Sequence, residues 1–315
     1  MFKNDVGESN ETSVKTFILL GLSNVLELKI VYSFIFLVMY TSTLTINVLL
    51  IVVVRSNEKL RTPMYFLLCN LSLIDICFSS TVVPKILANT LSEDKSISFL
   101  GCATQLYCHV TLGAMECLLL AVMSLDRYTA ICKPLHYNSI MNKGFCVHLT
   151  FACWVLSFLG SIILTEFTFR LSYCRSNHIN HYFCEMPQIL QLSCQDIWLS
   201  ELVEYILVII LGLGSLLFII TSYVFITLAI LKISTTNQRQ KAFSTCASHL
   251  VIVFLFFGAI LFMHLRPPSS YSPNQDKVLA LIYTVVAPVL NPIIYSIRNK
   301  DIKDCMKKIR FARFY

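Results

Sequence analysis

The chain has 315 residues, of which 56% are hydrophobic and only 14% are charged, and its formal net charge is +7. Soluble domains are closer to half apolar and a quarter charged, so this composition excludes an ordinary water-soluble fold. A large soluble helical domain with an unusually rich core is the alternative, but lipid is the better solvent for so much apolar surface.

Seven apolar segments are long enough to cross a bilayer as helices, which takes about 20 residues each. Helices are expected because lipid offers the backbone no hydrogen-bond partner, and the sequence lacks the short alternating segments of a β-barrel. We therefore predict an all-α membrane protein, a seven-transmembrane helix bundle. The segments run over residues 28–54, 63–87, 101–132, 145–167, 202–233, 242–265 and 273–297.

The distribution of Lys and Arg predicts the orientation of these segments. With the N-terminus outside, 16 of the 25 basic residues lie on the cytoplasmic side, beside only four acids. The net charge then divides into +12 inside, −3 outside and −2 within the membrane. We expect a multi-pass plasma-membrane protein with an extracellular N-terminus, and nucleic acid is not needed to explain the basic balance.

The two ends of the chain are more polar than the middle. Residues 1–27 contain the glycosylation sequon Asn10-Glu11-Thr12, and no removable signal peptide is expected because the first apolar segment is too long. Residues 298–315 predict a short amphipathic cytoplasmic helix on anionic lipid, with a frayed tail as the alternative. The expected domains are an extracellular tail (1–27), the seven-helix domain (28–297) and the cytoplasmic C-terminal helix and tail (298–315).

A long polar segment, residues 168–200, joins the fourth and fifth predicted helices, and segments of this length are usually functional or cross-linked. Four cysteines lie on the predicted outer side, namely Cys102, Cys174, Cys184 and Cys194. In an oxidising compartment they predict two disulfides, with three pairings open. A metal site with the nearby His178 and His181 is the alternative, although no C-x-x-C pair is present.

Characteristic strings stand at the ends of several segments. They are Pro63-Met64-Tyr65-Phe66-Leu67, Leu71-Ser72-Leu73-Ile74-Asp75, Met123-Ser124-Leu125-Asp126-Arg127-Tyr128-Thr129-Ala130-Ile131-Cys132, Pro134-Leu135-His136-Tyr137, Ser222-Tyr223, Lys241-Ala242-Phe243-Ser244-Thr245-Cys246-Ala247-Ser248-His249-Leu250, Pro288-Val289-Leu290-Asn291-Pro292-Ile293-Ile294-Tyr295-Ser296-Ile297-Arg298-Asn299 and Leu265-Arg266-Pro267. Together they resemble the odorant (olfactory) receptors, which are rhodopsin-like, class A G-protein-coupled receptors, and the last string resembles their tetrapod-type (class II) subgroup. The chain departs from the family at Ile46, where Gly is usual, and at Phe257, where Tyr is common.

The resemblance implies a receptor that is not an enzyme and requires no cofactor. Binding of a small, mostly apolar volatile ligand in the outer half of the bundle would activate a stimulatory, olfactory-type heterotrimeric G protein and raise cyclic AMP. It also implies the disulfide pairs Cys102–Cys184 and Cys174–Cys194.

The resemblance assigns coupling and activation to residues at the inner ends of the helices. Arg127 lies beside a carboxylate at a membrane boundary, so it can exchange partners between states; an Arg that merely extends its side chain to the interface is the alternative. The coupling residues are Asp126, Arg127, Tyr128, Tyr223, His249, Asn291, Pro292 and Tyr295.

By family position, twelve residues line the ligand cavity: His109, Val110, Gly113, Ala114, Leu207, Val208, Leu211, Phe257, Ile260, Leu261, His264 and Thr284. Such a mostly apolar lining suits small volatile organic compounds. His109 stands where amine receptors hold an Asp counter-ion, which disfavours a protonated amine. His109 and His264 can donate to a carbonyl, alcohol or acid, and a structural role for each histidine is the alternative.

Asp75 and Glu116 lie near the middle of predicted spans, where a charge is costly and a functional role is expected. In a rhodopsin-like bundle they would face one another, joined by Asn47 and Asn291. Two close carboxylates can share a proton or bind a cation, with Na⁺ the expected ion. A protonated, hydrogen-bonded polar core without an ion is the alternative.

Two other classes of membrane protein are alternatives to a receptor. A transporter or channel favours inverted repeats and broken helices around an ion path. A membrane enzyme would show a motif such as H-E-x-x-H or G-x-S-x-G, and neither occurs. Ligand-dependent cyclic AMP production would separate a receptor from both.

Overall fold

The computed structural model describes residues 14–22, 25–265 and 272–298, together with residues 302 and 305. The predicted glycosylation site at Asn10 and most of the predicted C-terminal helix lie outside the described residues.

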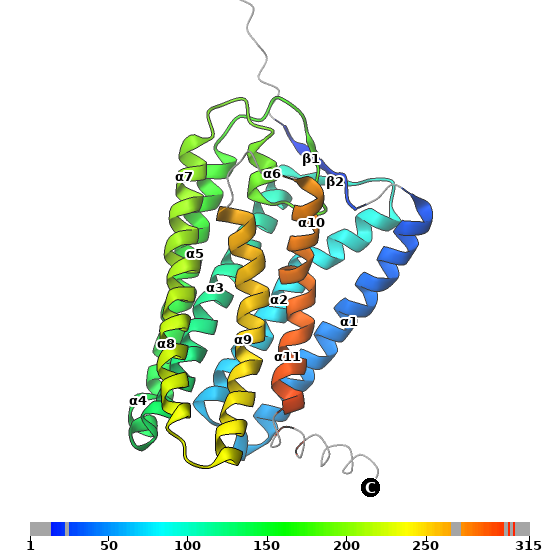
Figure 1. Cartoon of the computed structure of the whole chain (residues 1–315). Helices are drawn as coiled ribbons and strands as arrows, with labels where there is room; N and C mark the ends of the chain where they lie inside the picture. Colours follow the sequence, from blue (N-terminus) through cyan, green and yellow to red (C-terminus); the bar gives the residue numbers. More distant parts are fainter. Residues whose placement is uncertain (1–13, 23–24, 266–271, 299–301, 303–304, 306–315) are drawn as a thin grey trace, which may run out of the picture.

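Within the described residues, seven helical spans are long and apolar enough to cross a membrane, which confirms the predicted fold class (Figure 1). Five are single helices, and the fifth and seventh spans each contain a wide π-helical turn between two α-helices. The single helices are α1 (Leu26–Ser56), α2 (Pro63–Leu91), α3 (Phe99–Cys132), α5 (Lys143–Phe169) and α9 (Thr236–Leu265). The composite spans are α7 (Trp198–Leu207), η3 (Val208–Leu213) and α8 (Gly214–Leu231), then α10 (Pro273–Leu281), η5 (Ile282–Val286) and α11 (Ala287–Arg298).

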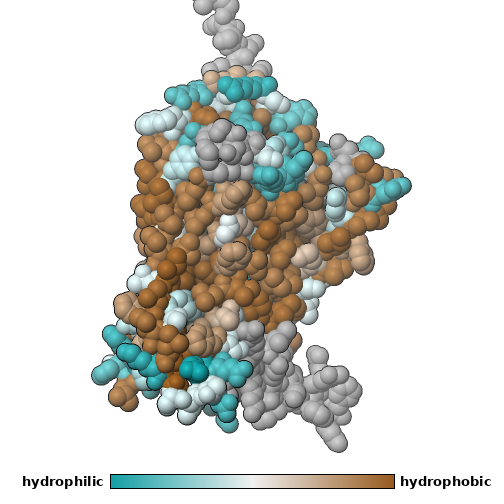
Figure 2. Space-filling model, viewed as in Figure 1, coloured by the Kyte–Doolittle hydropathy of each residue, from teal (hydrophilic) through white to brown (hydrophobic). Residues whose placement is uncertain are grey.

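The outer surface of the bundle is apolar around its middle and polar at its two ends (Figure 2). Large apolar side chains project outward from the helices; Phe34, Phe151 and Phe254 are 68%, 67% and 77% exposed. Such a continuous apolar surface is unfavourable in water and favourable against lipid. The helices therefore bury one face in the bundle and present the other to the bilayer.

A small three-stranded sheet closes one end of the bundle, which we call the sheet end (Figure 1). Strand β1 (Thr16–Leu19) pairs antiparallel with β2 (Ser96–Ser98) and parallel with β3 (His178–Ile179). Strand β1 lies in the segment predicted to be a polar extracellular tail, where no strand was expected. The strand forms because Phe17 and Leu19 are fully buried, which joins the tail to the long loop.

The opposite end carries three short helices, and we call it the α4 end. They are η1 (Glu58–Leu60), η2 (Pro134–His136) and α4 (Tyr137–Ile140). A further short helix, α6 (Met186–Leu190), lies in the long loop at the sheet end. At the α4 end, α8 ends at Leu231, close to the predicted end of the fifth segment at residue 233. Helix α9 begins at Thr236, earlier than the predicted start of the sixth segment at residue 242.

Helix α3 occupies the centre of the bundle, where it contacts α2, α5 and α8, while α1 contacts α2 and α11. Each residue adds about 1.5 Å along a helix, so His109 and Arg127 on α3 are about 27 Å apart. One rigid element therefore connects the two ends of the bundle, and each end carries a group of predicted functional residues.

Candidate functional site

A cavity of about 100 Å³ lies between the helices in the half of the bundle nearer the sheet end. Nine of the twelve predicted ligand residues line it, contributed by α3, α7, η3 and α9. The nine are His109, Val110, Gly113, Ala114, Leu207, Val208, Leu211, Ile260 and His264. Most of the lining is aliphatic, so an occupant would be held mainly by shape and apolar contact.

One polar part of the lining is a carboxyl group and a histidine on facing helices. Glu204 Oε1 on α7 lies 2.7 Å from His264 Nδ1 on α9, and both side chains are largely shielded from solvent. A charge-assisted hydrogen bond of this length is strong in a low-dielectric site. The pair therefore fixes one polar position in an otherwise apolar cavity.

A second carboxyl group enters the cavity from the long loop. Glu185 Oε1 accepts a hydrogen bond of 2.7 Å from the hydroxyl of Tyr283, which also lines the cavity. Burial raises the pKa of the Glu185 carboxyl to about 7, against the opposing effects of His264 and of the Tyr283 hydrogen bond. Burial lowers the pKa of His181 to about 3, so its 3.5 Å contact with Glu185 joins a neutral ring to the carboxyl.

His109 packs among aromatic rings. Its ring centroid lies 4.9 Å from that of Phe78, 4.7 Å from that of Phe183 and 5.7 Å from that of Tyr283. Among the described residues, its Nδ1 atom has no hydrogen-bond partner. The His109 ring therefore packs against other rings on several sides, and its Nδ1 atom can still form a hydrogen bond with a ligand.

The predicted coupling residues meet at the α4 end around Arg127, which is half-buried. Its neighbour Asp126 accepts a 2.8 Å hydrogen bond from Tyr137 on α4, so that carboxylate is bound to the loop. The charge of Arg127 acts on Tyr223, His249 and Tyr295, which come from α8, α9 and α11. Side chains from three helices of the bundle thus lie within electrostatic range of one cation.

Rings and buried hydroxyls complete this coupling region. The Tyr223 and His249 rings stack with centroids 5.6 Å apart, and Tyr128 packs edge-on against Phe225. Within the described part of the chain, the hydroxyls of Tyr223 and Tyr295 have no hydrogen-bond partner. Unpaired buried donors are costly, so a change of helix packing that pairs them would be favoured.

Between these two regions, Asn291 joins the two mid-membrane acids. Its Nδ2 donates to Asp75 Oδ1 at 2.8 Å and to Glu116 Oε1 at 3.2 Å, and both acids are fully buried. Asn47 does not complete this group as expected, because its Nδ2 donates to the carbonyls of Thr43 and Pro288. It binds α1 to α11, while its Oδ1 has no partner within the described residues.

The sequence profile of the olfactory receptor family matches residues 34–313. The chain belongs to the olfactory receptor family. It is 47% identical to human olfactory receptor 5A1 over 95% of each chain. It is 44% identical to mouse olfactory receptor 5AR1 and 46% identical to human olfactory receptor 8U9, in each case over at least 95% of both chains.

Three predicted ligand residues of this receptor do not line the cavity. Phe257 is buried against Phe256, with ring centroids 5.7 Å apart. The side chain of Leu261 packs against Gly212, where an added Cβ would meet it at 3.4 Å. The Thr284 hydroxyl donates 2.6 Å to the Ala280 carbonyl of its own helix. Phe257 thus packs against a ring of its own helix, Leu261 against η3, and Thr284 bonds the backbone of its own span.

Other lining residues of this olfactory receptor were missed. They are Phe78, Leu106, Cys117, Gly160, Ser161, Leu164, Glu185, Met186, Glu204, Gly212 and Tyr283. Glu204 had a usable signal, because an acid inside an apolar segment is a functional candidate. The lining residues of α5 were difficult to predict from the sequence, because the apolar residues of this helix face both the lipid and the cavity.

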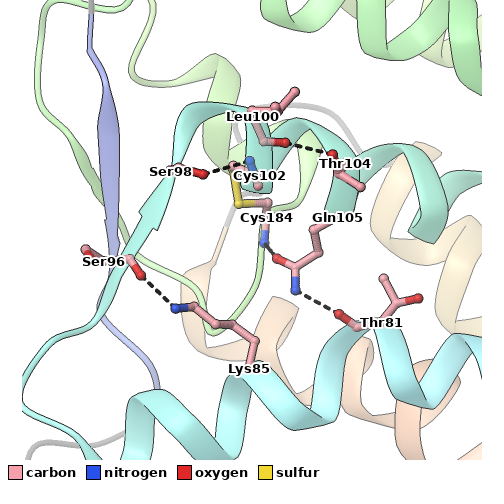
Figure 3. Close-up of a disulfide and its surroundings, with 10 residues drawn as sticks. Thr81, Lys85, Ser96, Ser98, Leu100, Cys102, Thr104, Gln105 and Cys184 are labelled. Carbon is pink, nitrogen blue, oxygen red and sulfur yellow. Dashed lines mark hydrogen bonds between the residues drawn. A yellow bond between two sulfur atoms is a disulfide. The ribbon is translucent and has the colours of Figure 1, made fainter.

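Two disulfides hold the long loop of this receptor, and they are the pairs that the resemblance implied. Cys102 is bonded to Cys184 with Cα atoms 5.5 Å apart, and Cys174 to Cys194 at 5.7 Å. Figure 3 shows Gln105 beside the first bridge, donating 2.9 Å to the Thr81 carbonyl and accepting 2.9 Å from the Cys184 amide. These contacts fix Glu185 and Met186 against the cavity.

Non-reducing peptide mapping of the purified receptor should give these two pairs. Replacing Cys102 and Cys184 by Ser should lower ligand sensitivity more than replacing Cys174 and Cys194, because only the first bridge joins the loop to α3. A peptide that joins Cys102 to Cys174 or to Cys194 would show that this pairing is wrong.

Proposed function

We propose that this receptor binds a small, mostly apolar volatile odorant in the cavity and activates a stimulatory, olfactory-type G protein, which raises cyclic AMP. The sheet end would face outside and the α4 end the cytoplasm of the cell, with the receptor in the plasma membrane. The excess of Lys and Arg near the α4 end supports this orientation. The observation that carries the proposal is the convergence of nine predicted ligand residues on one cavity.

The chemistry of the cavity indicates the kind of odorant that fits. Aliphatic side chains from α3, η3 and α9 would contact a hydrocarbon body. A hydroxyl group is small, and it can donate to Glu204 and accept from His264, which lie 2.7 Å apart. We therefore propose an aliphatic or terpenoid alcohol. A protonated amine stays disfavoured, because His109 stands where amine receptors hold an Asp counter-ion and because His264 already pairs with Glu204.

Coupling would follow from a rearrangement around Arg127. A ligand that binds one state of the bundle better shifts the population by its differential affinity alone. We propose that the odorant favours a state in which α9 moves relative to α3 and α8, so that Arg127 contacts the G protein. The Tyr223–His249 stack joins α8 to α9 and would transmit this movement.

This function can be tested with a panel of volatiles. The measurement is cyclic AMP production in receptor-expressing cells that are supplied with a stimulatory G protein. The panel should contain alcohols matched with alkanes of the same skeleton, and the alcohols should be the stronger agonists. Transport or chemical turnover of the volatiles without a cyclic AMP signal would favour a transporter or an enzyme instead.

We also propose that Asp75 and Glu116 bind Na⁺ in the resting state. Both acids are fully buried, and within the described residues Asp75 Oδ2 and Glu116 Oε2 have no hydrogen-bond partner. Asn291 brings the two carboxyl groups together through its amide and leaves its Oδ1 unpaired among the same residues. Oxygen atoms without partners are suitable ligands for a hard cation.

Na⁺ should lower basal signalling in the wild-type receptor, and Glu116→Gln should reduce this effect while leaving the packing nearly unchanged. Asp75→Asn should act likewise, and the double variant should add little to either single one because both empty the same site. Basal cyclic AMP in membranes tests this, with Na⁺ replaced by a large organic cation at fixed ionic strength. An unchanged wild-type signal would exclude the ion and leave a buried polar network that shares a proton.

A further inference from the structure

A second cavity, of about 610 Å³, lies at the α4 end between α1, α2 and α5. It is remote from the odorant cavity and contains none of the coupling residues named above. Val54, Leu60 and Phe66 form an apolar floor, and Arg55, Arg61 and Lys143 lie in the same lining. The site thus combines hydrocarbon and cationic groups, an arrangement that the signalling function does not require.

The three cations come from three separate parts of the chain that meet at the α4 end of the bundle. Arg55 lies in the last turn of α1, Arg61 follows η1, and Lys143 is the first residue of α5. Arg61 lies 3.4 Å from Glu58, but both side chains are highly exposed, so the pair is weak. Among the described residues, no carboxylate lies within ion-pair distance of Arg55 or Lys143. The site therefore has a net positive charge.

The apolar part of the cavity opens toward the surface that faces lipid. Leu73 of α2 lines the cavity and is 47% exposed, and Phe145 of α5, next to the lining residue Cys146, is 38% exposed. Exposure of these apolar side chains to water is unfavourable, whereas contact with a lipid acyl chain would bury them. An occupant can thus enter from the bilayer and need not cross the polar end of the bundle.

We propose that this groove binds a phosphoinositide, an anionic phospholipid of the cytoplasmic leaflet with a phosphorylated inositol headgroup. Arg55, Arg61 and Lys143 would bind the phosphates, and one acyl chain would lie over Leu73 and Phe66. Arginine forms bidentate hydrogen bonds with phosphate oxygens, and basic pockets between transmembrane helices on this side of a membrane suit such headgroups. The assignment to the cytoplasmic leaflet rests on the orientation proposed above.

Binding can be measured directly by native mass spectrometry of the full-length receptor with added phosphatidylinositol bisphosphate. The triple variant Arg55→Gln, Arg61→Gln and Lys143→Gln should lose at least about tenfold in affinity, since each basic residue near an anionic headgroup contributes to attraction. The charge-matched control is Lys133→Gln, Lys232→Gln and Arg239→Gln, which removes three cations from the same end of the bundle. The control should bind within about twofold of the wild type.

A second variant keeps all three charges. Leu73→Trp should fill the apolar half of the groove and lower affinity for the same lipid, while elution as a single species shows that the protein is folded. Equal binding by the wild type and the triple variant would overturn the proposal, as would an equal loss in the charge-matched control. Phosphatidylserine that binds as tightly at equal total charge would also overturn it, because surface charge alone would then explain binding.

This assay contains neither odorant nor G protein, so its result is independent of the signalling proposal. Lipid binding without odorant-dependent cyclic AMP would support the lipid site and contradict the proposed signalling function. Odorant-dependent cyclic AMP without lipid binding would support the signalling function and contradict the lipid site.

Discussion

Arg127→Ala should leave the receptor at the cell surface and reduce odorant-dependent cyclic AMP to the level of cells without receptor. The expected loss is large because Arg127 is the cation on which Tyr223, His249 and Tyr295 converge from three helices. Alanine removes the group that we propose contacts the G protein in the active state and leaves nothing of similar charge at that position. The residue is half-buried and forms no ion pair within the described residues, so its removal should leave folding largely intact.

The measurement is cyclic AMP at matched surface expression, with surface receptor quantified by an antibody to an N-terminal tag. Lys59→Ala is the control, because Lys59 is an exposed cation at the same end of the bundle, on η1. Signalling in the control should match the wild type. Full odorant-dependent signalling by Arg127→Ala at equal surface level would remove this residue from the coupling mechanism.

Gly113→Leu should greatly weaken the odorant response while retaining basal signalling. Gly113 lines the cavity on α3, and an added Cβ would meet only Phe78, at an ordinary 3.9 Å. A Cβ atom is therefore accommodated without backbone displacement, and the rest of a leucine side chain would project into the 100 Å³ cavity. Filling the cavity removes the volume that the hydrocarbon body of the odorant needs, so we expect the concentration for half-maximal response to rise by about 100-fold or more.

Gly258→Leu is the matched control, because the substitution is the same and the position differs. Gly258 lies on the exposed face of α9, with nothing within 4 Å of an added Cβ. Concentration–response curves for the three proteins should show the shift in Gly113→Leu alone. An equal shift in both variants would indicate a general effect of the larger side chain, and no shift in either would place the odorant elsewhere.

The sequence predicted the helices of this receptor well because the lipid requirement acts on whole segments. A run of about 20 apolar residues is visible without knowledge of what it contacts. Strand β1 was missed because its four residues are stabilised by distant partners, with Ile97 and Ser98 on one side and His178 and Ile179 on the other. A strand of four residues has no comparable run of apolar residues that would reveal it in the sequence.

The cavity lining was harder to predict because small changes of helix register decide which side chain faces inward. The wide turns η3 and η5 each rotate the helix that follows them. Thr284 lies within η5 and bonds its own helix, while the adjacent Tyr283 faces the cavity. The Glu204–His264 pair depends on the approach of α7 to α9, which neither segment reveals alone.

The most direct test of the central claim uses the purified receptor in lipid nanodiscs with a purified stimulatory G protein and the strongest alcohol from the panel. Nucleotide exchange on the G protein should accelerate with the alcohol in the wild type and stay at the basal rate in Gly113→Leu. In Arg127→Ala it should fall to the spontaneous rate of the G protein without receptor. An odorant that accelerates exchange equally in the wild type and in Gly113→Leu would contradict binding in this cavity. Binding of the alcohol to the wild type without any change in exchange would contradict the proposed coupling.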